Sequence, residues 1–410
     1  MAGHWFPALE GRSTRLYLVG QLVSILGSWV LDITLNLLVW QATRSPAMLG
    51  LLNVLLYGPG VVVTPLLSAR LGAGNARRIT LAVLCGAAAV ALGLWAAALA
   101  GALPLALLLG AAAVRGVLAG MEVPSRQLLL MHMARGAEQL SSAIALNTVA
   151  FLLARTLGPG LAAMMFEPLG PAWAFALAAA ATGFMLACVA RLPPPPGAAG
   201  PHAREGGGLR MAWRFVRSDR LGTLLLPLVT CVALCVSAYQ TLIPVLAGTV
   251  YGDAPRWTGR FFAAAGGGAL VAAVLLSSRH IEPVVRRLLL VVPWSGAAAL
   301  AVLGGTAEPA VALACFVVLG FCVSFVGTGT SALLHRRVPP AARGGLIGLF
   351  LLAFNGAMPV GQMLAGTVAG RLSAPGALYL LALLLSAGLL LLCGRRWAAL
   401  GRVEWDPFKV

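Results

Sequence analysis

Residues 66–83 read LLSARLGAGNARRITLAV, and residues 275–292 read LLSSRHIEPVVRRLLLVV. The two stretches align without a gap, and eight of the 18 positions are identical. The identical positions include three arginine pairs, which are Arg70/Arg279, Arg77/Arg286 and Arg78/Arg287. Low complexity inflates matches between apolar residues, but it does not explain a shared arginine spacing. The match therefore predicts an internal repeat that spans about half of the chain, as transporters built from two bundles have.

The composition surrounding the repeat is that of a membrane protein. The chain has 410 residues, of which 60% are hydrophobic and only 10% are charged. Soluble globular domains carry roughly 45–50% apolar and about 25% charged residues. The mean hydropathy of +0.91 agrees with a chain that crosses the bilayer many times.

Apolar runs of about 20 residues, the length that crosses a bilayer, divide the chain into twelve candidate spans. They cover approximately residues 16–40, 47–69, 79–101, 104–130, 139–165, 171–191, 221–249, 258–278, 286–305, 309–334, 345–369 and 375–393. The predicted fold is all-α, with two six-helix bundles in residues 1–191 and 221–410. A Pro/Gly-rich linker joins them at residues 192–220. From Leu209 to Arg220 the linker alternates arginine with Met, Trp and Phe, which predicts a short amphipathic helix on the inner leaflet.

The net charge of +17 is explained by orientation in the membrane. Of the 29 basic residues, 23 fall on the side that carries both termini and four on the other side. Because basic residues accumulate on the cytoplasmic side, both termini are predicted to be cytoplasmic. We therefore expect the bilayer, and no nucleic acid, as the partner of this basic surface. Lys409 is the single lysine, so a P-loop and a lysine Schiff base are excluded.

Cysteine and histidine give no sign of a metal site or of a disulfide framework. The seven cysteines are odd in number, contain no CxxC motif and lie within apolar runs. The five histidines flank the apolar runs without ligand spacing. No cluster of nucleophile, base and metal ligands is visible, so we expect neither a cofactor nor an enzyme, and a non-transporting receptor is also disfavoured.

Several motifs resemble the major facilitator superfamily. The loop Ala69-Arg70-Leu71-Gly72-Ala73-Gly74-Asn75-Ala76-Arg77-Arg78 is similar to its G-x-x-x-D-R-x-G-R-R gating element, with alanine at the acidic position and at both glycines. The fifth span contains Gly158-Pro159, similar to the GP motif of antiporters. The stretches at 138–163 and 338–372 resemble the enterobactin-exporter-like and macrolide-efflux-like branch. The resemblance covers about residues 14–394 and implies an exporter; by the repeat, the gating loop would include Arg279, Arg286 and Arg287.

Four ionisable residues inside predicted spans are the candidate coupling site: Asp32, Arg115, Glu122 and Arg155. Charges at such depth are expensive and usually functional. At a rise of 1.5 Å per residue, Asp32, Arg115 and Arg155 lie roughly 12–17 Å below the outer face. The resemblance implies that the first and fourth helices line a cavity, with the fifth beside them. We therefore predict an Asp32–Arg115–Arg155 cluster with a net charge of about +1, which suits an anionic substrate.

Two of these residues keep a second interpretation. Glu122 has Arg126 four residues later, so it forms either an ordinary i,i+4 pair or a second proton-coupling group. Arg155 precedes the Gly158–Pro159 bend, where it either serves the substrate or caps backbone carbonyls. A carboxylate such as Asp32, which has no opposite charge on its own helix, can exchange an arginine partner for a proton when access changes sides.

Polar side chains elsewhere are candidates for binding the substrate. Asn36 follows Asp32 by one turn and is expected to orient its carboxylate. In the C-terminal half the candidates are Tyr239 and Gln240 on the seventh span, and Asn355 and Gln362, which share a face of the eleventh. These amides bind the substrate or hold helices together. A further alignment of Pro159 with Pro359 places Arg155 opposite Asn355.

The sequence thus predicts a monomeric secondary transporter in the bacterial inner membrane. It would export a small organic molecule, a siderophore or similar anionic metabolite, by proton antiport. The alternatives are a multidrug or macrolide efflux pump and a lysophospholipid flippase of the same fold.

Overall fold

A computed structural model describes residues 7–68, 71, 73–133, 136–192, 208–219, 221–276, 282–337 and 343–401. Twelve helical regions in this part of the chain are long and apolar enough to cross a membrane. The prediction of an all-α fold with twelve spans is therefore confirmed. Arg70 and Arg279 of the predicted gating loops lie outside the described residues.

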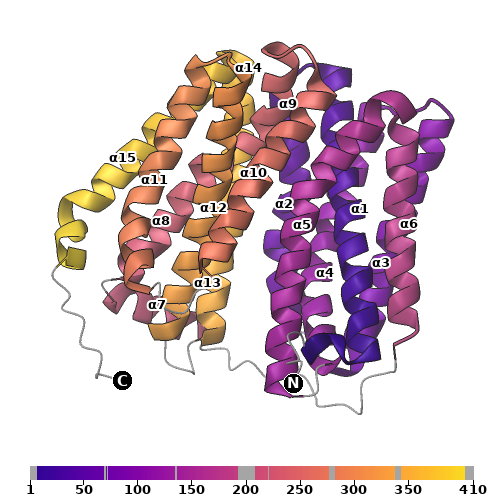
Figure 1. The fold of residues 1–410 in the computed structure, drawn as a ribbon, viewed down its shortest axis with the longest axis horizontal. Coiled ribbons are helices and arrows are strands. Elements are labelled where there is room, and N and C mark those ends of the chain that lie inside the picture. The colour runs from indigo at the N-terminus through magenta and orange to yellow at the C-terminus, as the bar shows by residue number, and fades with distance from the viewer. Residues whose placement is uncertain are drawn as a thin grey trace, which may run out of the picture.

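The N-terminal half forms one bundle, at the right of Figure 1. Its elements are η1 (Pro7–Leu9), α1 (Arg12–Thr43), α2 (Pro46–Ser68), α3 (Ala73–Leu99), α4 (Leu105–Met133), α5 (Ala137–Leu169) and α6 (Pro171–Ala190). Within it α1 packs against α5 and α6, and α4 packs against α2 and α3.

The C-terminal half forms the second bundle, preceded by a short helix. The elements are α7 (Gly208–Ser218), α8 (Gly222–Cys235), α9 (Tyr239–Thr249), α10 (Ala254–Leu276), α11 (Glu282–Gly305), α12 (Pro309–Arg337), α13 (Arg343–Asn355), α14 (Ala357–Arg371) and α15 (Ala374–Gly401). Helix α7 lies at the predicted amphipathic segment and at the same end of the molecule as the start of α1 (Figure 1).

Two spans of this half, predicted as continuous helices over residues 221–249 and 345–369, are each divided into two helices. Between α8 and α9 the amides of Tyr239 and Gln240 bond to carbonyls three residues back, and the Ser237 hydroxyl bonds to the Ala233 carbonyl. Such back-bonding by serine bends helices. Between α13 and α14 the break falls at Asn355 and Gly356. Pro359 explains it, because a proline clashes with the carbonyl four residues before it.

The two halves meet at the end opposite to the start of α1, which the charge distribution assigns to the outside. Helix α2 packs against α14, and α5 packs against α10. Glycine makes both crossings possible: a Cβ on Gly366 would lie 2.5 Å from the Pro46 carbonyl oxygen, and one on Gly259 would lie 2.5 Å from the Ala163 Cβ. Toward the other end the two bundles diverge (Figure 1). The arrangement is that of a two-bundle protein closed at its outer end.

This contact predicts that a larger residue at Gly366 opens the outer end. In a Thr241→Cys background, we expect Gly366→Val to speed the labelling of the introduced cysteine by an impermeant thiol reagent about tenfold, which corresponds to ~1.4 kcal/mol. Thr241 is fully buried beside the contact between the halves. Labelling is measured on intact cells by peptide mass spectrometry.

The matched control is Gly183→Val, because a Cβ on Gly183 would meet nothing within 4 Å. Equal labelling in the two variants would mean that the α2–α14 contact does not hold the outer end closed.

Candidate functional site

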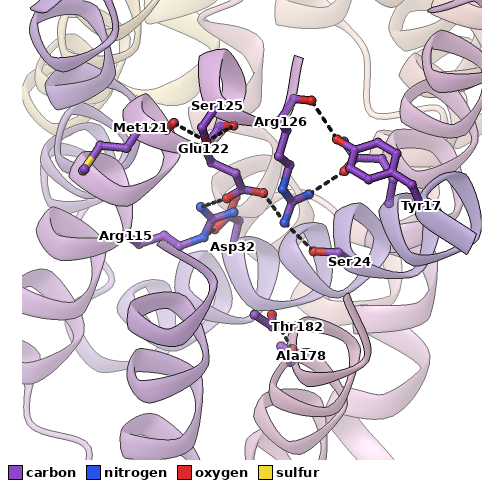
Figure 2. Close-up of polar contacts among 11 residues, drawn as sticks. Tyr17, Ser24, Asp32, Arg115, Met121, Glu122, Ser125, Arg126, Ala178 and Thr182 are labelled. Atoms are coloured by element: carbon purple, nitrogen blue, oxygen red, sulfur yellow. Dashed lines mark hydrogen bonds and ion pairs between the residues drawn. The ribbon is translucent and has the colours of Figure 1, made fainter. Parts of the chain in front are cut away.

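Four charged residues form a continuous chain of ion pairs inside the N-terminal bundle, and we call them the N-half charge chain: Asp32, Arg115, Glu122 and Arg126. Arg115 lies between two carboxylates, with its Nε 3.8 Å from Asp32 Oδ1 and its Nη1 3.6 Å from Glu122 Oε2. Glu122 Oε1 in turn lies 2.8 Å from Arg126 Nη2. Figure 2 shows Glu122 between the two guanidinium groups. The N-half charge chain therefore joins α1 to α4 through alternating charges.

Helical spacing places three members of the chain on one face of α4. Arg115, Glu122 and Arg126 are seven and four residues apart, which repeats one face of an α-helix. Gly120 lets α4 approach α2, because a Cβ there would lie 2.7 Å from the Gly60 Cα. Close packing against α2 fixes the height of α4 and so the positions of the charged side chains.

The two pairs formed by Arg115 are loose. At 3.6 and 3.8 Å they are ion pairs without hydrogen-bond geometry. Asp32 Oδ1 and Arg115 Nη1 are buried and have no hydrogen-bond partner among the described residues. An unmade hydrogen bond to a buried charged group costs more than one to a neutral group. Asp32 and Arg115 are thus close enough to attract each other but are not locked together.

Arg126, in contrast, is held firmly. Its Nη1 donates to Gln21 Oε1 at 2.8 Å and its Nη2 donates to Ser24 Oγ at 2.9 Å. The Tyr17 hydroxyl donates to the Arg126 carbonyl at 3.0 Å. The charge distribution in the sequence assigns Arg126 to the cytoplasmic connection, but the structure buries it within α4. Glu122 and Arg126 thus form the i,i+4 ion pair that is one of the two predicted interpretations. Arg115 lies near the same carboxylate.

The sequence contained a signal for these additional residues. Tyr17, Gln21, Ser24 and Asp32 recur at helical spacing along α1, so they form a polar stripe on an otherwise apolar helix. The stripe faces the charged face of α4. Of these four residues only Asp32 carries a formal charge, so the sequence singles it out while its neutral neighbours resemble ordinary helix residues.

Arg155 lies apart from the N-half charge chain. Its Nη2 donates to the Tyr239 hydroxyl at 3.5 Å, and its guanidinium carbon lies 6.0 Å from the centre of the Trp29 ring. Among the described residues no carboxylate forms an ion pair with it. Tyr57 lies within electrostatic reach of Asp32, Arg115 and Arg155. The Asp32–Arg115 pair of the predicted cluster is therefore present, but Arg155 is not joined to it by an ion pair among the described residues. Glu122 and Arg126 balance the N-half charge chain, and Arg155 supplies the excess positive charge.

The polar side chains around the breaks form two hydrogen-bonded groups. Asn53 Nδ2 donates to Asn36 Oδ1 at 3.3 Å and to Thr241 Oγ1 at 3.0 Å, which links the two halves. Asn36 Nδ2 bonds to the main-chain carbonyl of Asp32, so the expectation that it orients the carboxylate is wrong.

The second group involves Gln362, which is fully buried and donates to Gln240 Oε1 at 3.1 Å. Its own Oε1 has no hydrogen-bond partner among the described residues. Asn355 is exposed and ends α13, so it does not share a helix face with Gln362. The structure thus joins Gln240 to Gln362 and separates Asn355 from them, while the Tyr239 hydroxyl contacts Arg155.

The motifs taken from the family resemblance occupy packing positions. Gly158 lies against α1, where a Cβ would be 2.5 Å from Trp29 Cβ, and the Pro159 carbonyl lies against Gly259 of α10. Arg77 donates from Nη2 to the carbonyl of Ala190 at 2.8 Å, which caps the end of α6. Arg78 and Arg287 are exposed, and Arg286 is half-buried. Within the described residues, no group of three or more metal-ligating side chains is gathered.

Solved structures of several transporters have the same overall fold as this protein. The bacterial homologue of the human lysosomal transporter Spinster, solved inward-facing and unoccupied, superposes with a TM-score of 0.72 at 13% identity, covering 96% of this chain and 99% of that one. The nucleoside transporter NupG gives 0.67 at 12%, covering 96% and 100%. The human organic anion transporter MFSD10 gives 0.61 at 19%, covering 92% and 98%. The fold is therefore that of the major facilitator transporters.

The family follows from the sequence itself. Residues 3–406 match the family model described as transmembrane secretion effector, and the chain belongs to that family. Membership makes the protein a multi-pass membrane transporter of small molecules and not an enzyme. No curated protein sequence matches the chain.

The contrast between Arg115 and Arg126 predicts that Arg126 is needed for folding. We expect Arg126→Gln to destabilise the protein by about 3–5 kcal/mol, because it leaves the carboxylate of Glu122, whose side chain is only 14% exposed, without its close partner. The double variant Glu122→Gln/Arg126→Gln should recover most of this loss. Apparent unfolding temperatures in detergent, read by size-exclusion chromatography, measure both effects.

Arg12→Gln serves as the control, because it removes the same charge from an exposed position at the start of α1. A double variant no more stable than the single one would show that the pairing with Glu122 is not the reason for the loss.

Proposed function

We propose that the protein exports a small organic molecule with an anionic group, a siderophore or similar metabolite, across the bacterial inner membrane. It acts as a monomer by alternating access and is driven by protons moving inward. The observation that carries the proposal is the loosely shared Arg115 between Asp32 and Glu122. Membership of a secretion effector family supports the outward direction.

The proton step uses this shared arginine. When Asp32 is ionised, Arg115 divides its charge between two carboxylates. A proton on Asp32 removes one of them, and the guanidinium is then free to pair fully with Glu122. Because neither pair has hydrogen-bond geometry, the exchange breaks no strong contact. Glu122 stays in place throughout, since Arg126 holds it at 2.8 Å.

The substrate step uses Arg155. This half-buried guanidinium has no carboxylate partner among the described residues and contacts a tyrosine hydroxyl of the other half at 3.5 Å. An anionic group of the substrate would bind it with a charge-assisted hydrogen bond, which is stronger than a neutral one. Gln240 and Gln362 beside Tyr239 supply amides that orient the rest of the molecule, and Asn36 contributes through Asn53.

The proposal predicts that Asp32→Asn abolishes proton-driven transport. In everted vesicles with an acidic interior, wild type should accumulate one of three labelled probes: a catecholate siderophore, a macrolide or a lysophospholipid. We expect Asp32→Asn to reduce this accumulation at least about tenfold. A tenfold ratio corresponds to a free-energy difference of ~1.4 kcal/mol. Glu308→Gln, an exposed acid beyond the outer end of α11, should leave accumulation unchanged.

Full accumulation by Asp32→Asn would refute the coupling role of Asp32. Selection of the macrolide would favour multidrug efflux, and selection of the lysophospholipid would favour a flippase.

Arg155 is predicted to discriminate by charge. With an anionic substrate and its neutral ester, we expect Arg155→Gln to lower the preference for the anion about tenfold, while Arg155→Lys retains most of it, because a charge-assisted hydrogen bond contributes ~1.5–3 kcal/mol. Transport rates of the two compounds in the same vesicles give the ratio. Arg44→Gln, an exposed arginine of the outer surface, is the control. If the two compounds lose transport equally, Arg155 has a packing role instead.

A further inference from the structure

The short helix α7 presents two different faces. Ala212 and Val216 are buried and lie in the main apolar core, and the helix packs mostly against α13. Arg210, Arg214 and Arg217 are all exposed. Because successive residues of an α-helix turn by about 100°, these three arginines fall on one stripe opposite the buried face. We call this stripe the α7 basic stripe.

Two large exposed side chains border the stripe. Trp213 lies along one edge, at 45% exposure, and Met211 lies along the other, at 47%. The guanidinium carbon of Arg217 lies 5.3 Å from the centre of the Trp213 ring. Tryptophan beside arginine is the composition of the boundary between headgroups and acyl chains, where an aromatic ring reaches inward and a guanidinium reaches the phosphates. Helix α7 itself contains no acidic residue that could neutralise the stripe.

The connection to the next span holds α7 at the membrane surface. Helix α7 ends at Ser218 and the membrane-spanning α8 begins at Gly222. Four residues reach at most about 14 Å, so α7 cannot leave the headgroup region by much more than its own diameter. Asp219 shortens this reach, because its carboxylate accepts a hydrogen bond from the Gly222 amide at 2.9 Å.

We propose that the α7 basic stripe binds the headgroups of anionic phospholipids in the inner leaflet, and that this binding fixes the position of α13. Helix α13 can respond separately because the break at Asn355 and Gly356 divides it from α14, which holds the outer contact. The lipid therefore acts on the cytoplasmic part of a divided helix. This inference does not depend on the identity of the substrate or on proton coupling.

Hydrogen exchange of the full-length protein tests the proposal. The protein is placed in nanodiscs of phosphatidylcholine, with or without one quarter phosphatidylglycerol. We expect the anionic lipid to slow exchange of α13 amides at least about fivefold, which is the effect of roughly one basic residue at an anionic surface. In the triple variant Arg210→Gln/Arg214→Gln/Arg217→Gln, the α13 amides should exchange at the same rate in both kinds of nanodisc. The corresponding triple lysine variant should restore the slower exchange in the anionic nanodiscs.

The matched control is Arg12→Gln/Arg15→Gln/Arg78→Gln, which removes three exposed basic residues at the same end of the molecule. It should retain the lipid effect. Equal exchange of α13 in both nanodiscs for the wild type would overturn the proposal, as would loss of the effect in this control. If the glutamine variant folds poorly, the lysine variant still tests the proposal. A lysine variant that carries the same charge but shows no effect of the anionic lipid on α13 exchange would also overturn the proposal.

Discussion

The pairing of Glu122 with Arg126 is the contact on which the rest of the charged site depends. A charge within the bilayer is stable only when another charge or a set of hydrogen bonds compensates it. Glu122 obtains this from Arg126 at 2.8 Å, and Arg126 obtains it from Gln21 and Ser24 of α1 as well. Helices α1 and α4 are thereby fixed against each other. Glu122 can then share Arg115 loosely, because it already has a close partner in Arg126.

The two halves divide the work that a transporter needs. The N-terminal half holds the charges and keeps its spans continuous, even at Pro159 in α5. The C-terminal half holds amides and has two broken spans. The internal repeat makes this difference visible at one position, since Arg155 and Asn355 each precede a proline by four residues. In α5 the packing of Gly158 against Trp29 supports the helix through the proline, whereas α13 ends at Asn355.

Sequence predicted the fold well because length and hydropathy determine a spanning helix almost alone. The site was predicted less completely. Asp32, Arg115 and Glu122 can be identified from the sequence, because an isolated charge in an apolar run is easily recognised. The position of Arg155 beside Tyr239 depends on how two bundles meet, which no spacing within one helix encodes. Gln21 and Ser24 are not distinguishable in the sequence, because neutral polar residues at helical spacing differ little from ordinary residues in a helix. The breaks at Ser237 and Asn355 depend on single local features, a side-chain hydrogen bond and a proline, which do not alter the length or hydropathy of a span.

In the proposed function, the location of Arg155 connects the charge of the substrate to the contact between the halves. The N-half charge chain is balanced, so within the described candidate site the net attraction for an anion comes from Arg155. In the outer-closed arrangement Arg155 donates to Tyr239 of the opposite half across 3.5 Å. Opening the outer end separates the two side chains and leaves a guanidinium without this acceptor. In the proposed function, an anionic group bound there would replace the hydroxyl and offset the cost of separation. A substrate that carries such a group would then favour the movement that releases it, whereas the empty protein would retain the closing contact.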